Sequence, residues 1–180
     1  AICEDGLTEA EINFEVALLV VQGLREMGYT VDLLDEFDPR LDDYHAAALV
    51  SIHSNDCRDY GETVSGFLVA RASARPPGGL DDYLAECIGS TYGYATQLER
   101  RFSLTVDMTD YHTFREIHPL TPAAILELGF MREDRGLLTE QQDVLARGII
   151  EGVLCFINRT NPLTLPSAPT SEASPASPEV

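Results

Sequence analysis

Three side chains with hydrolytic chemistry stand at separate points of the chain: Glu9, His53 and Glu127. His53 directly follows residues 46–52, a short and mostly small apolar run that is typical of a buried strand. Ligands of open α/β sheets bind at the carboxyl ends of strands, so His53 stands where a catalytic or metal-binding group belongs. A lone histidine at a strand end more often just caps a backbone carbonyl, so His53 alone decides nothing.

Glu127 lies inside a second apolar run, residues 123–130, which also reads as a strand. An ionised carboxylate in such a strand is costly unless it is paired or used. Burial raises the pKa of a carboxyl group, which suits a general acid or base working near neutral pH. Pairing with a buried arginine, or exposure on an edge strand, would explain Glu127 equally well. Glu9 falls in the first turn of an expected helix, where a carboxylate is usually a partner of the helix dipole.

Taken together, Glu9, His53 and Glu127 suggest a hydrolytic zinc site. Such a site holds the ion with three protein ligands of His and Glu type and leaves one position for water. Zinc lowers the pKa of that water and polarises the substrate carbonyl. A separate carboxylate then takes the proton from the water and passes it to the leaving amine.

The elements that must position these residues follow from apolar periodicity and turn signals. Thr8 and Glu11 form a capping box ahead of a helix expected over residues 9–27. Further helices are expected over residues 62–73, 81–102 and 139–158, and strands over 29–34, 46–52, 104–108 and 123–130. The alternation predicts an α/β three-layer sandwich with a mostly parallel, twisted sheet between helices. A doubly wound sheet normally begins with a strand, so a first strand is expected to be missing ahead of this helix.

Composition bounds the remaining possibilities. We expect one domain over residues 1–158, followed by a disordered Pro/Ser/Ala-rich tail or linker over residues 159–180. The net charge is −18, from 30 acidic and 12 basic residues, and every basic residue is arginine. This charge argues against nucleic acid or an anionic membrane as a partner. No apolar run is long enough for a membrane span, and no signal peptide is recognisable.

The four cysteines, Cys3, Cys57, Cys87 and Cys155, form no CxxC or zinc-ribbon spacing. A disulfide between Cys3 and Cys57 is possible in an oxidising compartment, and four cysteines permit three full pairings. For Cys87 and Cys155, buried free thiols are at least as good an interpretation.

Three stretches resemble the zinc-dependent N-acetylmuramoyl-L-alanine amidases of the amidase-3 type. Residues 6–14, GLTEAEINF, are similar to the family's "GLxEKxxNL" segment. Residues 51–55, SIHSN, are similar to "SIHAN", and residues 124–130, AILELGF, to "VLVELGF". The order matches, and the likeness spans roughly residues 5–158. The resemblance implies that Glu9 and His53 bind Zn²⁺ and that Glu127 is the catalytic acid and base.

By the same resemblance, the chain hydrolyses the amide bond between N-acetylmuramic acid and L-alanine in peptidoglycan. The implied setting is extracytoplasmic, that is periplasmic, cell-wall or secreted, and we expect a monomer that binds peptidoglycan or a muropeptide. Asn55 and His112 are the expected substrate contacts. His118, in the same loop as His112, could also reach the site.

One feature departs from the family. Its first zinc ligand is a histidine in a "DPGHGG" segment upstream of the glutamate ligand, and this chain has no histidine before His45. The third ligand is therefore expected to be an upstream histidine that is not in this chain. His45 is a poor substitute, because it precedes its strand and should lie at the opposite end of the sheet from His53.

Two other functions remain open at this point. A degenerate amidase domain, lacking one ligand, would bind peptidoglycan or a partner without catalysis. A zinc carboxypeptidase-like hydrolase is the third possibility, although its usual HxxE ligand pair is absent.

Overall fold

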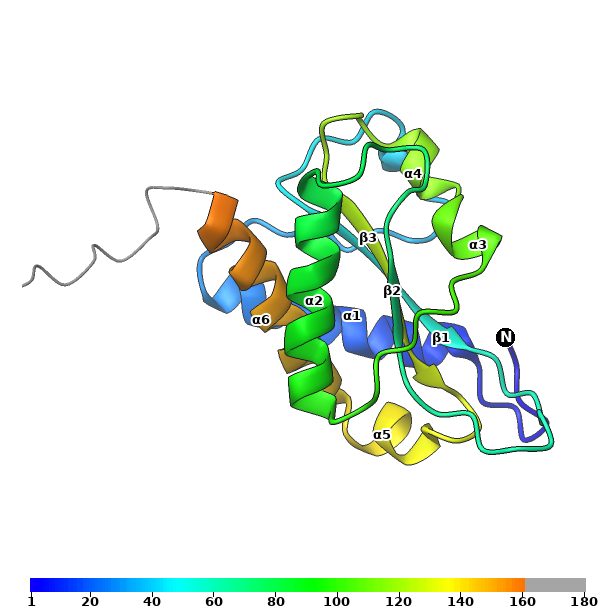
Figure 1. The fold of residues 1–180 in the computed structure, drawn as a ribbon. Helices are drawn as coiled ribbons and strands as arrows, with labels where there is room; N and C mark the ends of the chain where they lie inside the picture. The colour runs from blue at the N-terminus through cyan, green and yellow to red at the C-terminus, as the bar shows by residue number, and fades with distance from the viewer. Residues whose placement is uncertain (161–180) are drawn as a thin grey trace, which may run out of the picture.

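The computed structural model describes residues 1–160, and ten helices and strands occupy that range (Figure 1). Of the tail expected over residues 159–180, the first two residues, 159 and 160, end the last helix. Residues 161–180 lie outside the described residues. In chain order the elements are α1 (Glu9–Glu26), η1 (Pro39–Leu41), β1 (Leu49–Asn55), β2 (Leu68–Ala70), α2 (Leu80–Thr96), α3 (Val106–Thr109), α4 (Thr113–Glu116), β3 (Ala123–Phe130), α5 (Arg135–Glu140) and α6 (Gln142–Thr160).

The sheet has three described strands in the order β1-β3-β2. β1 pairs with β3 in parallel, and β2 pairs with β3 antiparallel, so the sheet is mixed rather than mostly parallel. The β1–β3 register places His53 directly opposite Glu127. Two of the three candidate residues are therefore neighbours on adjacent strands.

Helices cover both faces of this sheet, which confirms the predicted α/β sandwich (Figure 1). Ala124, Leu126 and Leu128 of β3 pack into a core with α1, α2 and α6. Ala123 and Ile125, which alternate with them, pack into a second core with η1, α3 and α4. This alternation sets which side chains of β3 face each layer.

α2 and α6 approach each other very closely. A Cβ atom at Gly148 would lie 2.9 Å from the Cα of Tyr92, and one at Gly152 would lie 2.8 Å from the Cα of Ile88. A Cys87–Cys155 disulfide joins the same two helices, so the interpretation of these cysteines as free thiols is wrong. The Tyr92 hydroxyl donates to the Leu128 carbonyl at 2.8 Å, which ties this helix pair to the sheet.

Several predicted elements are wrong. Residues 62–73 form no helix, and β2 lies among them. A helix is not formed here because Gly66 has φ +117° and a Cβ at this position would lie 2.5 Å from the Glu99 carbonyl oxygen. Residues 104–108 form no strand and instead lead into α3. Residues 29–34 are assigned no strand, and the Arg25 guanidinium donates to the Val31 carbonyl. α2 ends at Thr96 rather than near residue 102, and Gln97, the residue that follows its end, adopts φ +59°.

Among the described residues, no helix combines the length and the apolar character needed to cross a membrane.

Candidate functional site

Glu9 and His53 meet at the carboxyl end of β1. Glu9 is the first residue of α1, whose start is fixed by the Thr8–Glu11 capping box predicted from sequence. Its Oε1 lies 3.0 Å from Nδ1 of His53. The first turn of α1 and the end of β1 therefore present a carboxylate and an imidazole to one another, although 44 positions separate them in the chain.

One further side chain and one backbone amide hold Glu9 in this position. Asn13, one helical turn later, donates from Nδ2 to Glu9 Oε1 at 3.3 Å, and the Ser54 amide donates to the same oxygen at 3.3 Å. The Ser54 hydroxyl in turn donates to Asn13 Oδ1 at 2.8 Å. This small network fixes the glutamate relative to the strand as well as to its own helix.

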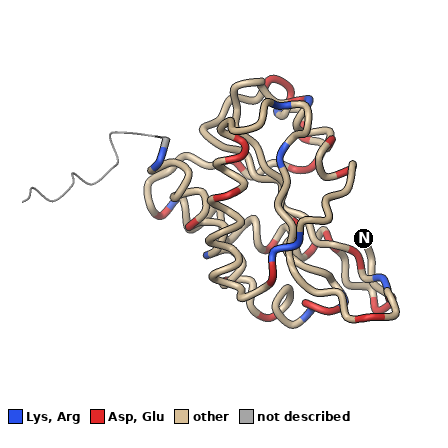
Figure 2. Tube along the Cα trace, in the orientation of Figure 1, with Lys and Arg blue, Asp and Glu red and all other residues tan. Residues whose placement is uncertain are grey.

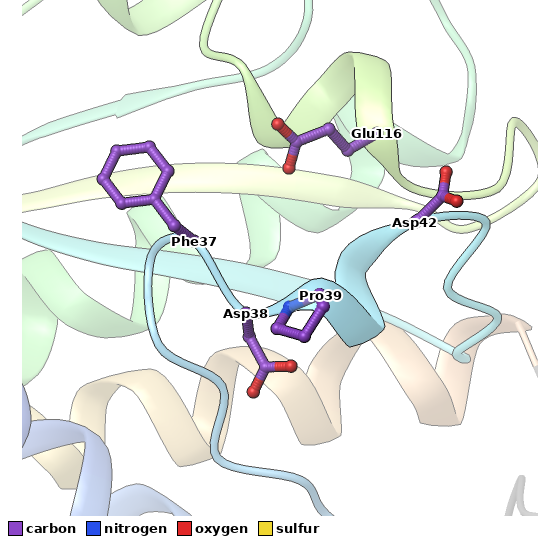
Figure 3. Close-up of a pocket in the computed structure, with 5 residues that line it drawn as sticks. All are labelled: Phe37, Asp38, Pro39, Asp42 and Glu116. Atoms are coloured by element: carbon purple, nitrogen blue, oxygen red, sulfur yellow. The ribbon is translucent and has the colours of Figure 1, made fainter.

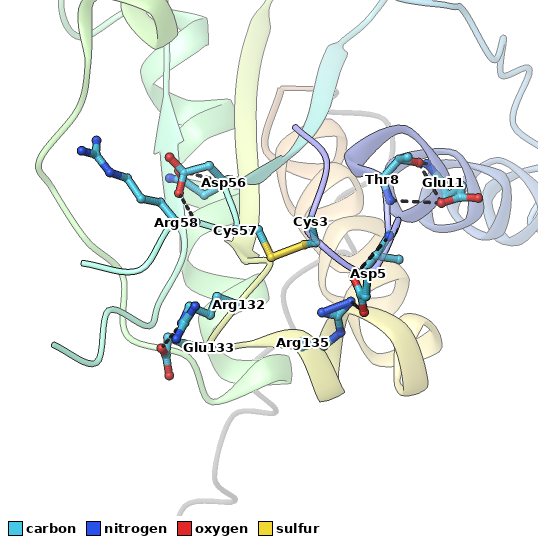
Figure 4. The surroundings of a disulfide bond; sticks show 12 residues. Cys3, Asp5, Thr8, Glu11, Asp56, Cys57, Arg58, Arg132, Glu133 and Arg135 are labelled. Carbon is cyan, nitrogen blue, oxygen red and sulfur yellow. Dashed lines mark hydrogen bonds and ion pairs between the residues drawn. A yellow bond between two sulfur atoms is a disulfide. The ribbon is translucent and has the colours of Figure 1, made fainter. Parts of the chain in front are cut away.

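The Cys3–Cys57 disulfide closes the same region (Figure 4). It joins the segment before α1 to the loop after β1, as the sequence allowed, and Asp5 of that segment pairs with Arg135. The amino group of Ala1 lies 2.7 Å from Oε2 of Glu9. The bridge thus holds together the two segments that carry Glu9 and His53.

Tyr111 is the residue on the other side of the imidazole. Its hydroxyl lies 3.1 Å from Nε2 of His53, and the two rings meet edge to face with centroids 5.1 Å apart. The same hydroxyl lies 3.4 Å from Oε1 of Glu36. Because the ionised Glu9 can only accept, the 3.0 Å contact places a proton on Nδ1 of His53. When an ion takes the place of that proton, Nε2 carries the remaining one and can donate a hydrogen bond to the Tyr111 oxygen.

Glu127 lies on β3 opposite His53 and is largely buried. Its Oε2 has no hydrogen-bond partner, and no arginine pairs with it among residues 1–160. Burial raises the pKa of Glu127 to about 7, although the charge of His53 acts in the opposite direction. A carboxyl group in this state can hold or release a proton near neutral pH.

The pKa values of Glu9 and His53 are also shifted. Burial acts to raise the pKa of Glu9, but hydrogen bonds with His53 and the Ala1 amino group bring it down to about 2. Burial acts to lower the pKa of His53, but the hydrogen bond to Glu9 and the charge of Glu127 raise it above its usual value. The site therefore combines a firmly ionised carboxylate with a carboxyl group that titrates near neutrality.

The remaining candidates divide between the two ends of the sheet. Asn55 ends β1 at an irregularity in the β1–β3 register, and its Oδ1 accepts from the Asp56 amide at 3.0 Å. His112 lies beside the site, with its ring centroid 4.5 Å from that of Tyr111 and its Nδ1 3.0 Å from Glu116 Oε1. His118 does not reach the site: it stacks on His45, which precedes β1, with centroids 3.5 Å apart. The expectation that His45 lies at the opposite end from His53 is confirmed.

Sequence reasoning missed Tyr111, Asn13 and Ser54. Asn13 could have been found, because it follows Glu9 by four residues and so shares its face of α1. Tyr111 lies in the turn between α3 and α4, where no periodic pattern indicates the direction of a side chain.

Comparisons with known proteins show that several solved N-acetylmuramoyl-L-alanine amidases share this fold. No protein-family model matches the sequence, and no curated protein matches it significantly. The N-acetylmuramyl-L-alanine amidase Ami1 of Mycobacterium smegmatis superposes with a TM-score of 0.72 at 19% identity, covering 88% of this chain and 81% of Ami1. The N-acetylmuramoyl-L-alanine amidase AmiC2 of Nostoc punctiforme gives 0.69 at 24% identity, covering 88% and 89% of the two chains.

The catalytic domain of CwlV, an N-acetylmuramoyl-L-alanine amidase from Bacillus (Paenibacillus) polymyxa var. colistinus, gives a TM-score of 0.64 at 20% identity. The superposition covers 83% of this chain and 85% of that domain. At such identities the likeness establishes a shared fold, and the chain has the α/β architecture of these catalytic domains.

Proposed function

We propose that this chain is the catalytic part of a zinc-dependent N-acetylmuramoyl-L-alanine amidase, which hydrolyses the amide bond between N-acetylmuramic acid and L-alanine in peptidoglycan. The observation that carries the proposal is the 3.0 Å contact between Glu9 and His53, with Glu127 opposite His53 on the next strand. The three sequence resemblances and the shared fold of the amidase structures support it.

The residues present fit two ligands of one zinc ion. Two ligands about 2 Å from a common ion lie roughly 3 to 4 Å apart, and Glu9 Oε1 and His53 Nδ1 satisfy this. The buried, unpartnered Oε2 of Glu127 fits a group whose partner is water or substrate. Catalytic zinc takes three protein ligands, so we propose a third, a histidine outside residues 1–180, as the resemblance implies.

A large groove supports a further segment at this edge of the molecule. It has a volume of about 1040 Å³ and is lined by β1, by residues 29–36 and by apolar side chains of α1 and α6. β1 pairs only with β3 in the described structure, so its other edge has backbone groups without a ladder partner. A strand lying in this groove parallel to β1 would end beside His53 and could carry the third ligand there.

In this proposal each residue has a separate task. Bound zinc would polarise the scissile carbonyl and acidify a water molecule. Glu9 and His53 would hold the ion, and the Tyr111 oxygen would accept a hydrogen bond from Nε2–H of His53 and so fix the tautomer that leaves Nδ1 free for the metal. Glu127 accepts the proton of the attacking water on its carboxylate and returns it to the leaving L-alanine nitrogen. Asn55 and His112 orient the substrate at the rim.

The test is a pair of substitutions in the zinc-loaded full chain, with release of stem peptide from purified peptidoglycan as the assay. Glu127→Ala should abolish release while zinc content, measured by mass spectrometry of the metal, stays equal to that of the parent. His53→Ala should lose one zinc ion per chain as well as activity. Continued release by the Glu127→Ala protein would refute the role given to Glu127.

A second function is favoured by one observation, which is that residues 1–160 bring only Glu9 and His53 together as ligands at this end of the sheet. A domain with two ligands would hold zinc weakly and would bind peptidoglycan without cutting it. Sedimentation with purified peptidoglycan, combined with a metal assay on the bound fraction, separates the two functions. Retention without metal and without product favours the binding domain.

We also propose an extracytoplasmic location and a monomeric state. The two disulfides support the location, because disulfides persist in oxidising compartments. Size-exclusion chromatography with light scattering tests the monomer.

A further inference from the structure

A second group of metal-binding side chains lies at the end of the sheet opposite Glu9 and His53. Asp43, His45 and His118 each place one ligand atom so that all these atoms lie within 4.8 Å of one another. His53 follows the first residue of β1 by four positions, which separates it from this end by at least about 13 Å of strand. The cluster is therefore distinct from the hydrolytic site.

The cluster belongs to two loops whose backbones are fixed to one another. The Asp43 amide donates to the Glu116 carbonyl at 2.9 Å, and the His118 amide donates to the Tyr44 carbonyl at 3.3 Å. The Thr121 hydroxyl donates to the same Tyr44 carbonyl at 2.8 Å and accepts from the Ala46 amide at 3.1 Å. The proximity of the three side chains thus results from backbone contacts and not from chance contact between mobile side chains.

The two imidazoles lie face to face, with ring centroids 3.5 Å apart and planes inclined by 28°. A metal ion can bind an imidazole through either ring nitrogen. Nδ1 of His118 already presents its lone pair, because it accepts from the Leu120 amide at 3.1 Å. Leu120 is 79% exposed, so water can take over that amide when the nitrogen turns to an ion.

The surroundings favour a cation. A small pocket of about 290 Å³ is lined by Phe37, Asp38, Pro39, Asp42 and Glu116 (Figure 3), and the carbonyl of Glu116 accepts from the Asp43 amide. Asp42 directly precedes Asp43, and acidic residues outnumber basic ones over the whole trace (Figure 2). This field raises the local concentration of divalent cations at the two loops.

We propose that Asp43, His45 and His118 form a second, surface-exposed site for a divalent transition metal. Two imidazole nitrogens and one carboxylate oxygen form a donor set suited to Zn²⁺, Cu²⁺, Ni²⁺ or Co²⁺, whereas Mg²⁺ and Ca²⁺ prefer sites made of oxygen alone. Three protein ligands leave a fourth position open to water. The exposed His45 ring and the half-buried His118 ring close on the ion by rotating about their own side-chain bonds.

The test is a titration of the metal-free chain with ZnCl₂, followed by isothermal calorimetry and by the histidine signals in proton NMR. Added Zn²⁺ should shift the ring signals of His45 and His118 together, at a stoichiometry of one ion for this pair. The double variant His45→Ala, His118→Ala should bind one Zn²⁺ fewer than the parent, and Asp43→Asn should weaken this binding about tenfold. CaCl₂ at the same concentrations should shift neither ring.

Asp42→Asn is the matched control, since it removes the carboxylate next to Asp43 that contributes no ligand to the cluster, and its stoichiometry should equal that of the parent. The variants alter surface side chains, and circular dichroism checks that they fold. Equal Zn²⁺ stoichiometry for the double variant and the parent, or ring signals of His45 and His118 unmoved by Zn²⁺, would overturn the proposal.

Discussion

At the scale of single residues, Glu127 has the most unusual environment of the site. It is largely buried on β3, its Oε2 has no partner, and its pKa is about 7 against an ordinary value of 4.5. A raised folded-state pKa means that the folded chain holds this proton more tightly than the unfolded chain does. Its contribution to stability is complete below pH 4.5 and is lost as pH rises through about 7.

We therefore expect the metal-free chain to lose up to about 3 kcal/mol of unfolding free energy between pH 4.5 and pH 8 through this one residue. Glu127→Gln, which cannot ionise, should lack that part of the loss. Urea unfolding of both proteins across this range measures the difference. If the two proteins show the same pH dependence, Glu127 does not titrate in the way described.

Tyr111 gives a second prediction at this scale. Its hydroxyl contacts Nε2 of His53, and loss of such a partner typically weakens metal binding 10- to 100-fold. Tyr111→Phe should therefore raise the dissociation constant for zinc at the Glu9–His53 site by at least about tenfold, measured by competition with a chelator. Tyr60→Phe is the control, because the Tyr60 hydroxyl donates to Asp56 and not to Glu9 or His53, and its zinc affinity should match that of the parent. Unchanged affinity in Tyr111→Phe would contradict the assigned contact.

The residue types of Glu9, His53 and Glu127 and their positions in predicted elements were enough to identify them as candidates. The structure brings Glu9 and His53 within 3.0 Å of one another. Their roles stay predictions. Tyr111 could not be nominated, because a loop tyrosine becomes significant only when the fold carries it to a histidine 58 positions away.

At the scale of elements, the two disulfides have different neighbours. Cys3–Cys57 joins the segments that carry Glu9 and His53, whereas Cys87–Cys155 joins α2 to α6. They close loops of similar length, with sequence separations of 54 and 68, so removing either should cost about 2–5 kcal/mol of stability. Only the first should also change the geometry of the Glu9–His53 pair.

We expect Cys3→Ala, Cys57→Ala to weaken zinc binding and Cys87→Ala, Cys155→Ala to leave it unchanged. Denaturant unfolding gives the stability of both double variants, and zinc competition gives the affinity. Equal zinc affinities in the two variants would show that the first bridge does not position the ligands.

Elements with a clear periodic pattern were predictable. α1 and β3 lie close to their predicted bounds because apolar spacing and the capping box specify them. β1 begins and ends three residues later than the predicted strand over residues 46–52, so His53 lies within the strand rather than after it. The predicted helix over residues 62–73 was wrong because Gly66 adopts a positive φ and its backbone lies close to the Glu99 carbonyl oxygen. That approach is a tertiary contact, which local sequence patterns do not reveal. The predicted strand over residues 29–34 finds no ladder partner among the described residues.

At the scale of the whole molecule, the excess of acidic residues sets the response to salt. With a net charge of −18, the folded chain repels itself more strongly than the expanded chain does. Added salt screens this repulsion, since the Debye length falls from about 30 Å at 0.01 M to about 10 Å at 0.1 M. The melting temperature should therefore rise by a few degrees between about 0.01 M and about 0.5 M salt.

NaCl and KCl at equal ionic strength should give the same rise, which distinguishes screening from specific ion binding. Thermal unfolding followed by circular dichroism provides the measurement. A melting temperature that stays constant or falls with salt would show that self-repulsion is not a major cost for this fold.

The sandwich architecture was predictable at this scale, because alternating helices and strands leave few other arrangements. The mixed sheet was not, since the direction of β2 depends on the chain path around Gly66 and on pairing with β3. The groove beside β1 was likewise invisible, because its walls come from four parts of the chain that are distant in sequence.

The position of the Cys3–Cys57 bridge also links chemistry to the timing of maturation. While both thiols are reduced, no covalent bond joins the segment before α1 to the loop after β1. Oxidation then fixes these two segments, and with them Glu9 and His53, relative to one another. Under the amidase function proposed above, a newly made chain would bind its metal fully only after reaching an oxidising compartment, so hydrolysis would begin only there.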